Sequence, residues 1–133
     1  MTNGGSDIST NAHLRTLDSS EPRFCAWRGQ SYGVDIVTVD ALGLRAHGVQ
    51  PRDPSAYRIY GARVLAPCGG QAVIAVDGLP DMPVPEMDRD HLAGNHVMLR
   101  GAESDVLLGH VRPGSVRVRP CTKVAVGDDV VAV

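Results

Sequence analysis

The feature that most constrains this fold is the shortness of its apolar runs. Short β-branched or alternating runs are separated by Gly, Pro and Asp along most of the chain. No window keeps apolar residues at positions i, i+3, i+4 and i+7 through successive helical turns. The pattern therefore predicts an all-β chain. The expected strands are Arg23–Trp27, Tyr32–Val39, Arg58–Leu65, Gln71–Val76, His96–Arg100, Asp105–His110, Ser115–Val118 and Asp129–Val133.

The chain is long enough for one domain with a buried core, because 43% of its 133 residues are hydrophobic. Residues 1–20 are rich in Ser, Thr, Asn and Gly, and we expect them to form a disordered arm. Residues 21–133 are then expected to form a single β domain. The order of apolar strand, glycine and apolar strand occurs at 64–76 and again at 123–133. This repetition suggests a duplicated hybrid motif, which is a barrel-sandwich-like antiparallel fold.

Turn-forming residues predict where the strands reverse. Glycine, which adopts positive φ angles at little cost, occurs in three such turns. These are Pro67–Gly70, Arg112–Ser115 and Val126–Asp129. The stretch from Asp77 to Gly94 is rich in proline and acidic residues, which disfavour strand ladders. We expect it to be a long surface loop, of the kind that often borders a functional site.

Composition argues against several classes of partner. The formal charge of −2 and the pI near 6.2 provide no general attraction to nucleic acid. The chain shows no signal-peptide core and no apolar stretch long enough to span a membrane. Cys25, Cys68 and Cys121 are an odd number without Cys-x-x-Cys spacing, so reduced thiols are expected. We therefore expect a soluble cytoplasmic protein that binds neither nucleic acid nor membrane.

Several short motifs follow one another between about Gln30 and Val133. Ser31-Tyr-Gly-Val-Asp35 comes first, and Val64-Leu-Ala-Pro-Cys-Gly-Gly70 combines a strand with a turn. Gly94-Asn-His-Val-Met-Leu99 enters another strand, and Leu108-Gly-His-Val111 ends one. In this order and spacing the motifs resemble the lysostaphin-type (LytM-like) zinc peptidase domain. The resemblance implies the duplicated β fold described above.

The resemblance also implies an incomplete zinc site. It makes Asp35 a metal ligand and His110 a catalytic histidine that does not bind the metal. Ser31 stands where the family has a histidine ligand, and the sequence ends at Val133, before the family's His-x-His strand. A hydrolytic zinc ion needs three protein ligands and an open position for water. We therefore expect no cofactor, or zinc only if other residues complete the site.

Each of these residues also has a plain structural interpretation. Asp35 could be a strand-edge acid bonded to a backbone amide or an arginine, and His110 could be a hydrogen-bonded inward residue. His96 lies in an apolar strand, where a structural role is more common. His47 and His91 are at no family position, and as loop histidines they are expected to be solvated.

A second resemblance involves two histidines. Asn95-His96 and Leu107-Leu-Gly-His110 resemble motifs of the glucose-permease type IIA domains of sugar phosphotransferase systems. Two histidines on neighbouring strands would suit phosphoryl relay, because one imidazole can accept the group while the other stabilises its charge. The Gly-x-Asp segment that follows the second histidine in that family is absent here.

We therefore expect a non-catalytic or vestigial relative of the lysostaphin-type zinc peptidases that acts as a binding or structural domain. The alternatives are a zinc metalloendopeptidase acting on peptidoglycan peptides, with a completed or dimer-shared site, and a histidine phosphocarrier. The apolar strand at 130–133 lacks the partner strand that follows it in relatives. This predicts an exposed edge and a homodimer formed through it. By family analogy alone, a cell-wall peptide or a cell-wall enzyme is the expected binding partner.

Overall fold

The structure is a computed structural model that describes residues 3–133, apart from the side chain of Ala26. The chain forms two compact units, Met1–Val39 and Asp40–Val133, and each is described by itself. This division falls inside the single domain predicted for 21–133. The single domain and the disordered arm at 1–20 both stay predictions. None of the helices among the described residues is long and apolar enough to cross a membrane.

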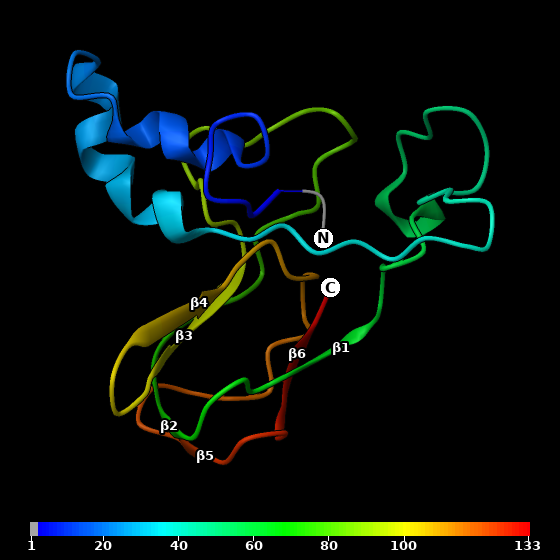
Figure 1. Cartoon of the computed structure of the whole chain (residues 1–133). Helices are drawn as coiled ribbons and strands as arrows, with labels where there is room; N and C mark the ends of the chain where they lie inside the picture. Colours follow the sequence, from blue (N-terminus) through cyan, green and yellow to red (C-terminus); the bar gives the residue numbers. More distant parts are fainter. Residues whose placement is uncertain (1–2) are drawn as a thin grey trace. The chain divides into compact units, whose positions relative to one another are not determined.

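The first unit contains two 3-10 helices, η1 (Ala12–Leu17) and η2 (Pro22–Tyr32), which are drawn in blue and cyan in Figure 1. The strand predicted at Arg23–Trp27 is therefore wrong. Pro22 is the first residue of η2, where its fixed φ favours a helix and its missing N–H costs nothing. Phe24 and Trp27 are one 3-10 turn apart, and their ring centroids lie 6.2 Å from each other. This three-residue spacing was the helical signal in the segment.

The strand predicted at Tyr32–Val39 is also wrong. Its alternating apolar residues face solvent, and Ile36 is 71% exposed. Within the first unit this segment makes one isolated antiparallel bridge, between Asn3 and Asp35. Alternation predicts a strand only where another strand supplies backbone partners, because unpaired amides and carbonyls gain nothing from the extended ladder.

The second unit holds one short 3-10 helix, η3 (Pro54–Ala56), and two antiparallel sheets. Their strands are β1 (Arg63–Leu65), β2 (Gly70–Val76), β3 (His96–Arg100), β4 (Asp105–Leu108), β5 (Lys123–Val124) and β6 (Asp129–Ala132). The larger sheet has the order β4-β3-β2-β5, and the smaller sheet pairs β1 with β6 (Figure 1). The predicted β-rich character is confirmed. Asp77–Gly94 forms no strand, as expected for a long loop.

Several strands differ from the prediction. The strand predicted at Asp105–His110 ends at Leu108, and His110 has a left-handed φ of 56° that no regular strand adopts. The run predicted at Arg58–Leu65 is extended only from Arg63, because turns with the bonds Tyr60 N–H to Tyr57 and Ala62 N–H to Ile59 occupy its first half. Residues Ser115–Val118 were predicted as a strand but form none, although Arg117 donates its N–H to the Val130 carbonyl. The short strand β5 was not predicted.

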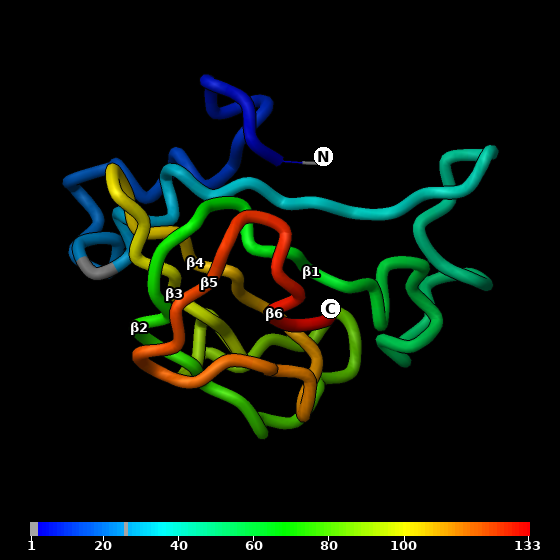
Figure 2. Tube along the Cα trace, turned by 90° about the horizontal axis from the view of Figure 1, so that it is seen from below, coloured from blue at the N-terminus to red at the C-terminus, as the bar shows by residue number. Residues whose placement is uncertain are grey.

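Both sheets of the second unit contribute to one apolar core. The largest fully buried side chains are Val97 and Leu99 from β3 and Val130 and Val131 from β6. Figure 2 shows the labelled strands of the two sheets close together around this interior. Because side chains alternate along a strand, the neighbours of Val97 on β3, His96 and Met98, face away from the core and are half-buried.

Glycine has two different uses in the turns of this unit. Gly114 and Gly127 have φ angles of 73° and 87°, which confirms the positive-φ turns predicted at Arg112–Ser115 and Val126–Asp129. The same prediction for Pro67–Gly70 is wrong, because neither of its glycines has positive φ. Gly70 is needed for another reason. A Cβ at this position would lie 2.0 Å from the carbonyl oxygen of Arg100 on the paired strand.

The predicted exposed edge of the last strand is wrong as well. One edge of β6 pairs with β1. The other edge is bonded to the segment before β5: Arg112 donates its N–H to the Ala132 carbonyl at 2.9 Å, and the Ser115 hydroxyl accepts the Ala132 N–H at 3.2 Å. Both edges of β6 are therefore occupied. The predicted homodimer, by strand exchange or edge pairing, stays a prediction.

Candidate functional site

The candidate site is built on the segment His110–Arg112, which follows β4 and is hydrogen-bonded both to the residues that precede β3 and to β6. The His110 N–H donates to the Ala93 carbonyl at 2.9 Å, and the Arg112 N–H donates to the Ala132 carbonyl at 2.9 Å. Between them, Val111 is 4% exposed and belongs to the core. His110 and Arg112, the residues on either side of Val111, both line a cavity on the surface.

This cavity, which we call the Tyr60 cavity, has a volume of about 180 Å³. Its polar groups are Tyr60, Asp81, His110 and Arg112, and its apolar wall consists of Pro54, Tyr57, Ile59, Val84 and Val133. The Tyr60 hydroxyl donates to the Asp81 carboxylate at 3.1 Å. The guanidinium carbon of Arg112 lies over the Tyr60 ring, 5.8 Å from its centroid. Tyr60 is thus held between a carboxylate and a guanidinium.

The surroundings of Tyr60 favour the neutral form of its phenol. Burial raises the pKa of Tyr60, and the hydrogen bond to Asp81 raises this pKa further, because it favours the protonated hydroxyl. The positive charge of Arg112 opposes both effects. Tyr60 therefore serves as a hydrogen-bond donor in this cavity.

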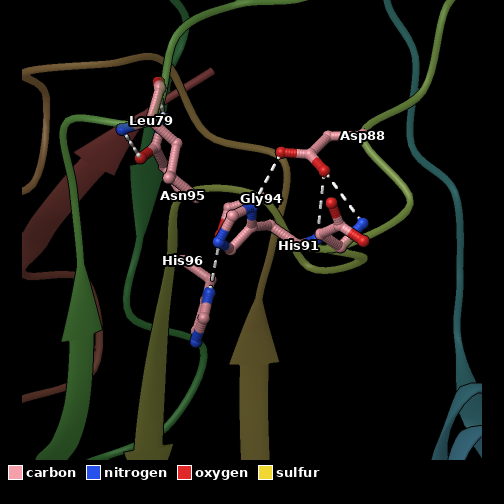
Figure 3. A network of polar contacts seen from close by, with 7 residues as sticks. Leu79, Asp88, His91, Gly94, Asn95 and His96 are labelled. Atoms are coloured by element: carbon pink, nitrogen blue, oxygen red, sulfur yellow. Dashed lines mark hydrogen bonds and ion pairs between the residues drawn. The ribbon is translucent and has the colours of Figure 1, made fainter.

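A second cavity of about 190 Å³, which we call the loop cavity, lies under the long loop between β2 and β3. Its titratable lining residues are Asp81, Glu86, Asp88, His91 and His110, and apolar residues such as Leu79, Met82 and Met87 complete it. The loop is tied down by Asn95, which is 4% exposed. Its side-chain amide bonds both the N–H and the carbonyl of Leu79 at 2.8 Å (Figure 3).

Asp88 and His91 form a local pair at the rim of the loop cavity. The Nδ1 atom of His91 lies 2.8 Å from the Asp88 carboxylate, as Figure 3 shows. This hydrogen bond, together with the amides of Asp90 and His91, lowers the pKa of Asp88 because it stabilises the ionised carboxylate. The pair fixes the orientation of the His91 ring.

His110 and Asp81 are the two residues that line both cavities. His110 is the more unusual of the two. It adopts a left-handed backbone conformation with a φ angle of 56°, which is uncommon for residues other than glycine. Its imidazole takes part in none of the histidine hydrogen bonds or ion pairs within residues 3–133. Its side chain is exposed. A left-handed backbone that presents an unbonded imidazole beside two cavities makes His110 the candidate functional residue.

Asp35 and Ser31, the other two positions of the predicted zinc site, lie in the first unit. Both side chains are hydrogen-bonded there. The Asp35 carboxylate accepts the Asn3 side-chain amide at 3.1 Å and lies 3.7 Å from the Nε2 atom of His13. The Ser31 side chain is buried, and its hydroxyl donates to the Arg28 carbonyl at 2.7 Å. Within residues 3–133, no three His, Cys, Asp or Glu side chains gather closely enough to hold a metal ion.

His96, the third candidate from the sequence, lines neither cavity. Its Nδ1 atom lies 2.7 Å from the Gly94 carbonyl (Figure 3). The structure thus separates His96, which turns toward the backbone, from His110, which faces the cavities. His47 is exposed, and its backbone N–H donates to the Ala56 carbonyl.

Sequence reasoning missed Tyr60, Asp81, Arg112 and His13. Arg112 lay in a stretch that was predicted only as a turn, two residues after His110. Tyr60 was hidden inside a predicted strand, and Asp81 was one of several acids in the long loop. His13 lies in the segment predicted as a disordered arm.

The comparisons with known proteins add no relative. No protein-family model matches the chain, and no curated protein or solved structure is significantly similar to it.

Proposed function

We propose that this chain is a non-catalytic domain related to the lysostaphin-type zinc peptidases, and that it binds a ligand at the Tyr60 cavity and the adjoining loop cavity. A duplicated hybrid motif with barrel-sandwich-like sheets is part of this proposal. The observation that carries the binding role is His110, with its left-handed backbone and unbonded imidazole at the wall that the two cavities share.

The non-catalytic part of the proposal rests on how the remaining motif residues are used. Ser31 replaces a histidine ligand, and its hydroxyl is bonded to a backbone carbonyl. The Asp35 carboxylate is bonded to Asn3. Strands β1, β2 and β3 coincide with the strand-like motifs on which the resemblance depends. A binding role would keep these strands while needing no metal.

By family analogy, the first ligand to test is a purified peptidoglycan stem peptide. We expect an NMR titration of the full chain to shift the amide signals of Tyr60, Asp81 and His110–Arg112, and we expect the peptide to remain intact in the presence of zinc. The His110→Ala variant should bind about fivefold more weakly, as expected for the loss of roughly one hydrogen bond.

His47→Ala is the matched control, because His47 is an exposed histidine outside both cavities. This variant should bind like the wild type. Zinc-dependent cleavage of the peptide that disappears in Asp35→Ala would instead identify an active zinc metalloendopeptidase. Binding that shifts signals only away from the two cavities would contradict the proposed site.

A further inference from the structure

The Tyr60 cavity holds two opposite charges that do not neutralise each other. Arg112 lies over the Tyr60 ring, and Asp81 accepts the Tyr60 hydroxyl. Neither residue belongs to any ion pair within residues 3–133. Tyr60 therefore contacts a guanidinium at its ring and a carboxylate at its hydroxyl.

The rest of the Tyr60 cavity is apolar and small. Ile59, Val84 and Val133 contribute aliphatic wall, and the volume is about 180 Å³. A cavity of roughly 150 Å³ holds one benzene molecule, whereas drug-sized ligands need about 300 Å³ or more. The volume therefore suits one apolar side chain of a ligand whose charged groups lie at the polar residues of the cavity.

The Tyr60 cavity and the loop cavity are lined by different charged residues. Beyond Asp81 the surface continues into the loop cavity, which adds Glu86 and Asp88. Glu86 pairs with Arg52, and Asp88 pairs with His91. Of the charged residues named, Arg112 lines only the Tyr60 cavity, Glu86 and Asp88 line only the loop cavity, and Asp81 lines both.

We propose that the Tyr60 cavity binds a short zwitterionic peptide with an apolar side chain, with its carboxylate at Arg112 and its ammonium group at Asp81. A guanidinium offers paired donors that match a carboxylate, and a carboxylate accepts readily from an ammonium group. The apolar side chain of the ligand would pack against Ile59 and Val84. This inference rests on the proposed binding function and names the ligand class of the same site.

The test compares the dipeptide Ala-Leu with two derivatives that each lack one of its charges. The C-terminal amide lacks the carboxylate, and the N-acetyl derivative lacks the ammonium group. Affinities for the full chain are measured by NMR titration at constant ionic strength. We expect Ala-Leu to bind most tightly and each blocked form to bind about fivefold more weakly, the effect of a partly exposed charge pair. Equal affinities for all three probes would overturn the inference.

Two variants assign each charge to its partner. Arg112→Gln should remove the preference for Ala-Leu over its amide, and Asp81→Asn should remove the preference over the N-acetyl form. Arg119→Gln is the control, because Arg119 is exposed, lines neither cavity and forms no ion pair among the described residues. It should keep both preferences. A carboxylate preference that survives in Arg112→Gln would contradict the assignment.

The outcome for this ligand class can be separated from the proposed function. If Ala-Leu shifts no signal at the Tyr60 cavity, the zwitterionic class is wrong. Binding of the stem peptide that depends on His110 would still support a binding domain in that case. Loss of both responses would remove the proposed function as well.

Discussion

At the scale of single residues, the glycines show that one residue type answers two separate physical demands. Gly114 and Gly127 satisfy a positive φ, and the turn composition around them was sufficient to predict it. Gly70 satisfies a close approach between two strands, because the Arg100 carbonyl occupies the space where a Cβ would lie. The sequence shows the local turn, whereas the strand that approaches Gly70 is known only from the fold.

Gly70→Ala should therefore destabilise the protein strongly. The added methyl group meets backbone, which can move only by disturbing the pairing of β2 with β3. We expect a loss of about 3 kcal/mol or more in the free energy of unfolding, measured by denaturant titration. Gly69→Ala is the control, because its Cβ would meet its nearest atom at an ordinary 3.7 Å. It should change the free energy by less than about 0.5 kcal/mol. Equal losses in the two variants would contradict the close-approach argument.

His110 and Arg112 show what residue-level reasoning found and missed in the site. His110 was identified through its motif, and the structure places it at both cavities. Arg112, Tyr60 and Asp81 belong to no motif. They gather because a turn, a loop and a strand connection meet, which no local pattern in the chain encodes.

At the scale of elements, the last strand illustrates how tertiary contacts alter a sequence-based expectation. An apolar strand without a following partner predicts an open edge. In the structure, the segment Arg112–Val118 forms no strand of its own, yet it supplies hydrogen bonds along that edge. Ser115 is central to this arrangement, since its buried hydroxyl lies 2.9 Å from the Ala132 carbonyl and accepts the Ala132 N–H.

Ser115→Ala should weaken the attachment of this segment to β6. The substitution leaves the buried N–H of Ala132 without its partner, which costs about 1–3 kcal/mol of folding free energy. Urea unfolding of the full chain measures the loss. Ser104→Ala removes a hydroxyl that is exposed and unbonded within the described chain, and it should be nearly neutral. A Ser115→Ala variant as stable as the wild type would show that β6 does not depend on the hydrogen bonds between Ser115 and Ala132.

At the scale of the whole molecule, the accuracy of the sequence prediction differs between the two units. In Asp40–Val133, the alternating runs that became β2, β3, β4 and β6 face strand partners and a common core, so their pattern had a structural cause. In Met1–Val39, the runs at 23–27 and 32–39 have no ladder partner within the unit, and a 3-10 helix takes the first of them. Periodicity predicts a strand correctly only where the rest of the fold provides a neighbour.

The molecule-level claim is that this chain binds its ligand without a catalytic metal, and its zinc content tests that claim most directly. The purified chain is incubated with one equivalent of zinc, exchanged into metal-free buffer and analysed by mass spectrometry for metal, with thermal unfolding recorded before and after. We predict well under one zinc ion per chain and an unchanged melting temperature, because a metal that does not bind the native state cannot stabilise it. One retained zinc ion per chain, with a raised melting temperature that returns to the metal-free value in Asp35→Ala, would contradict the account.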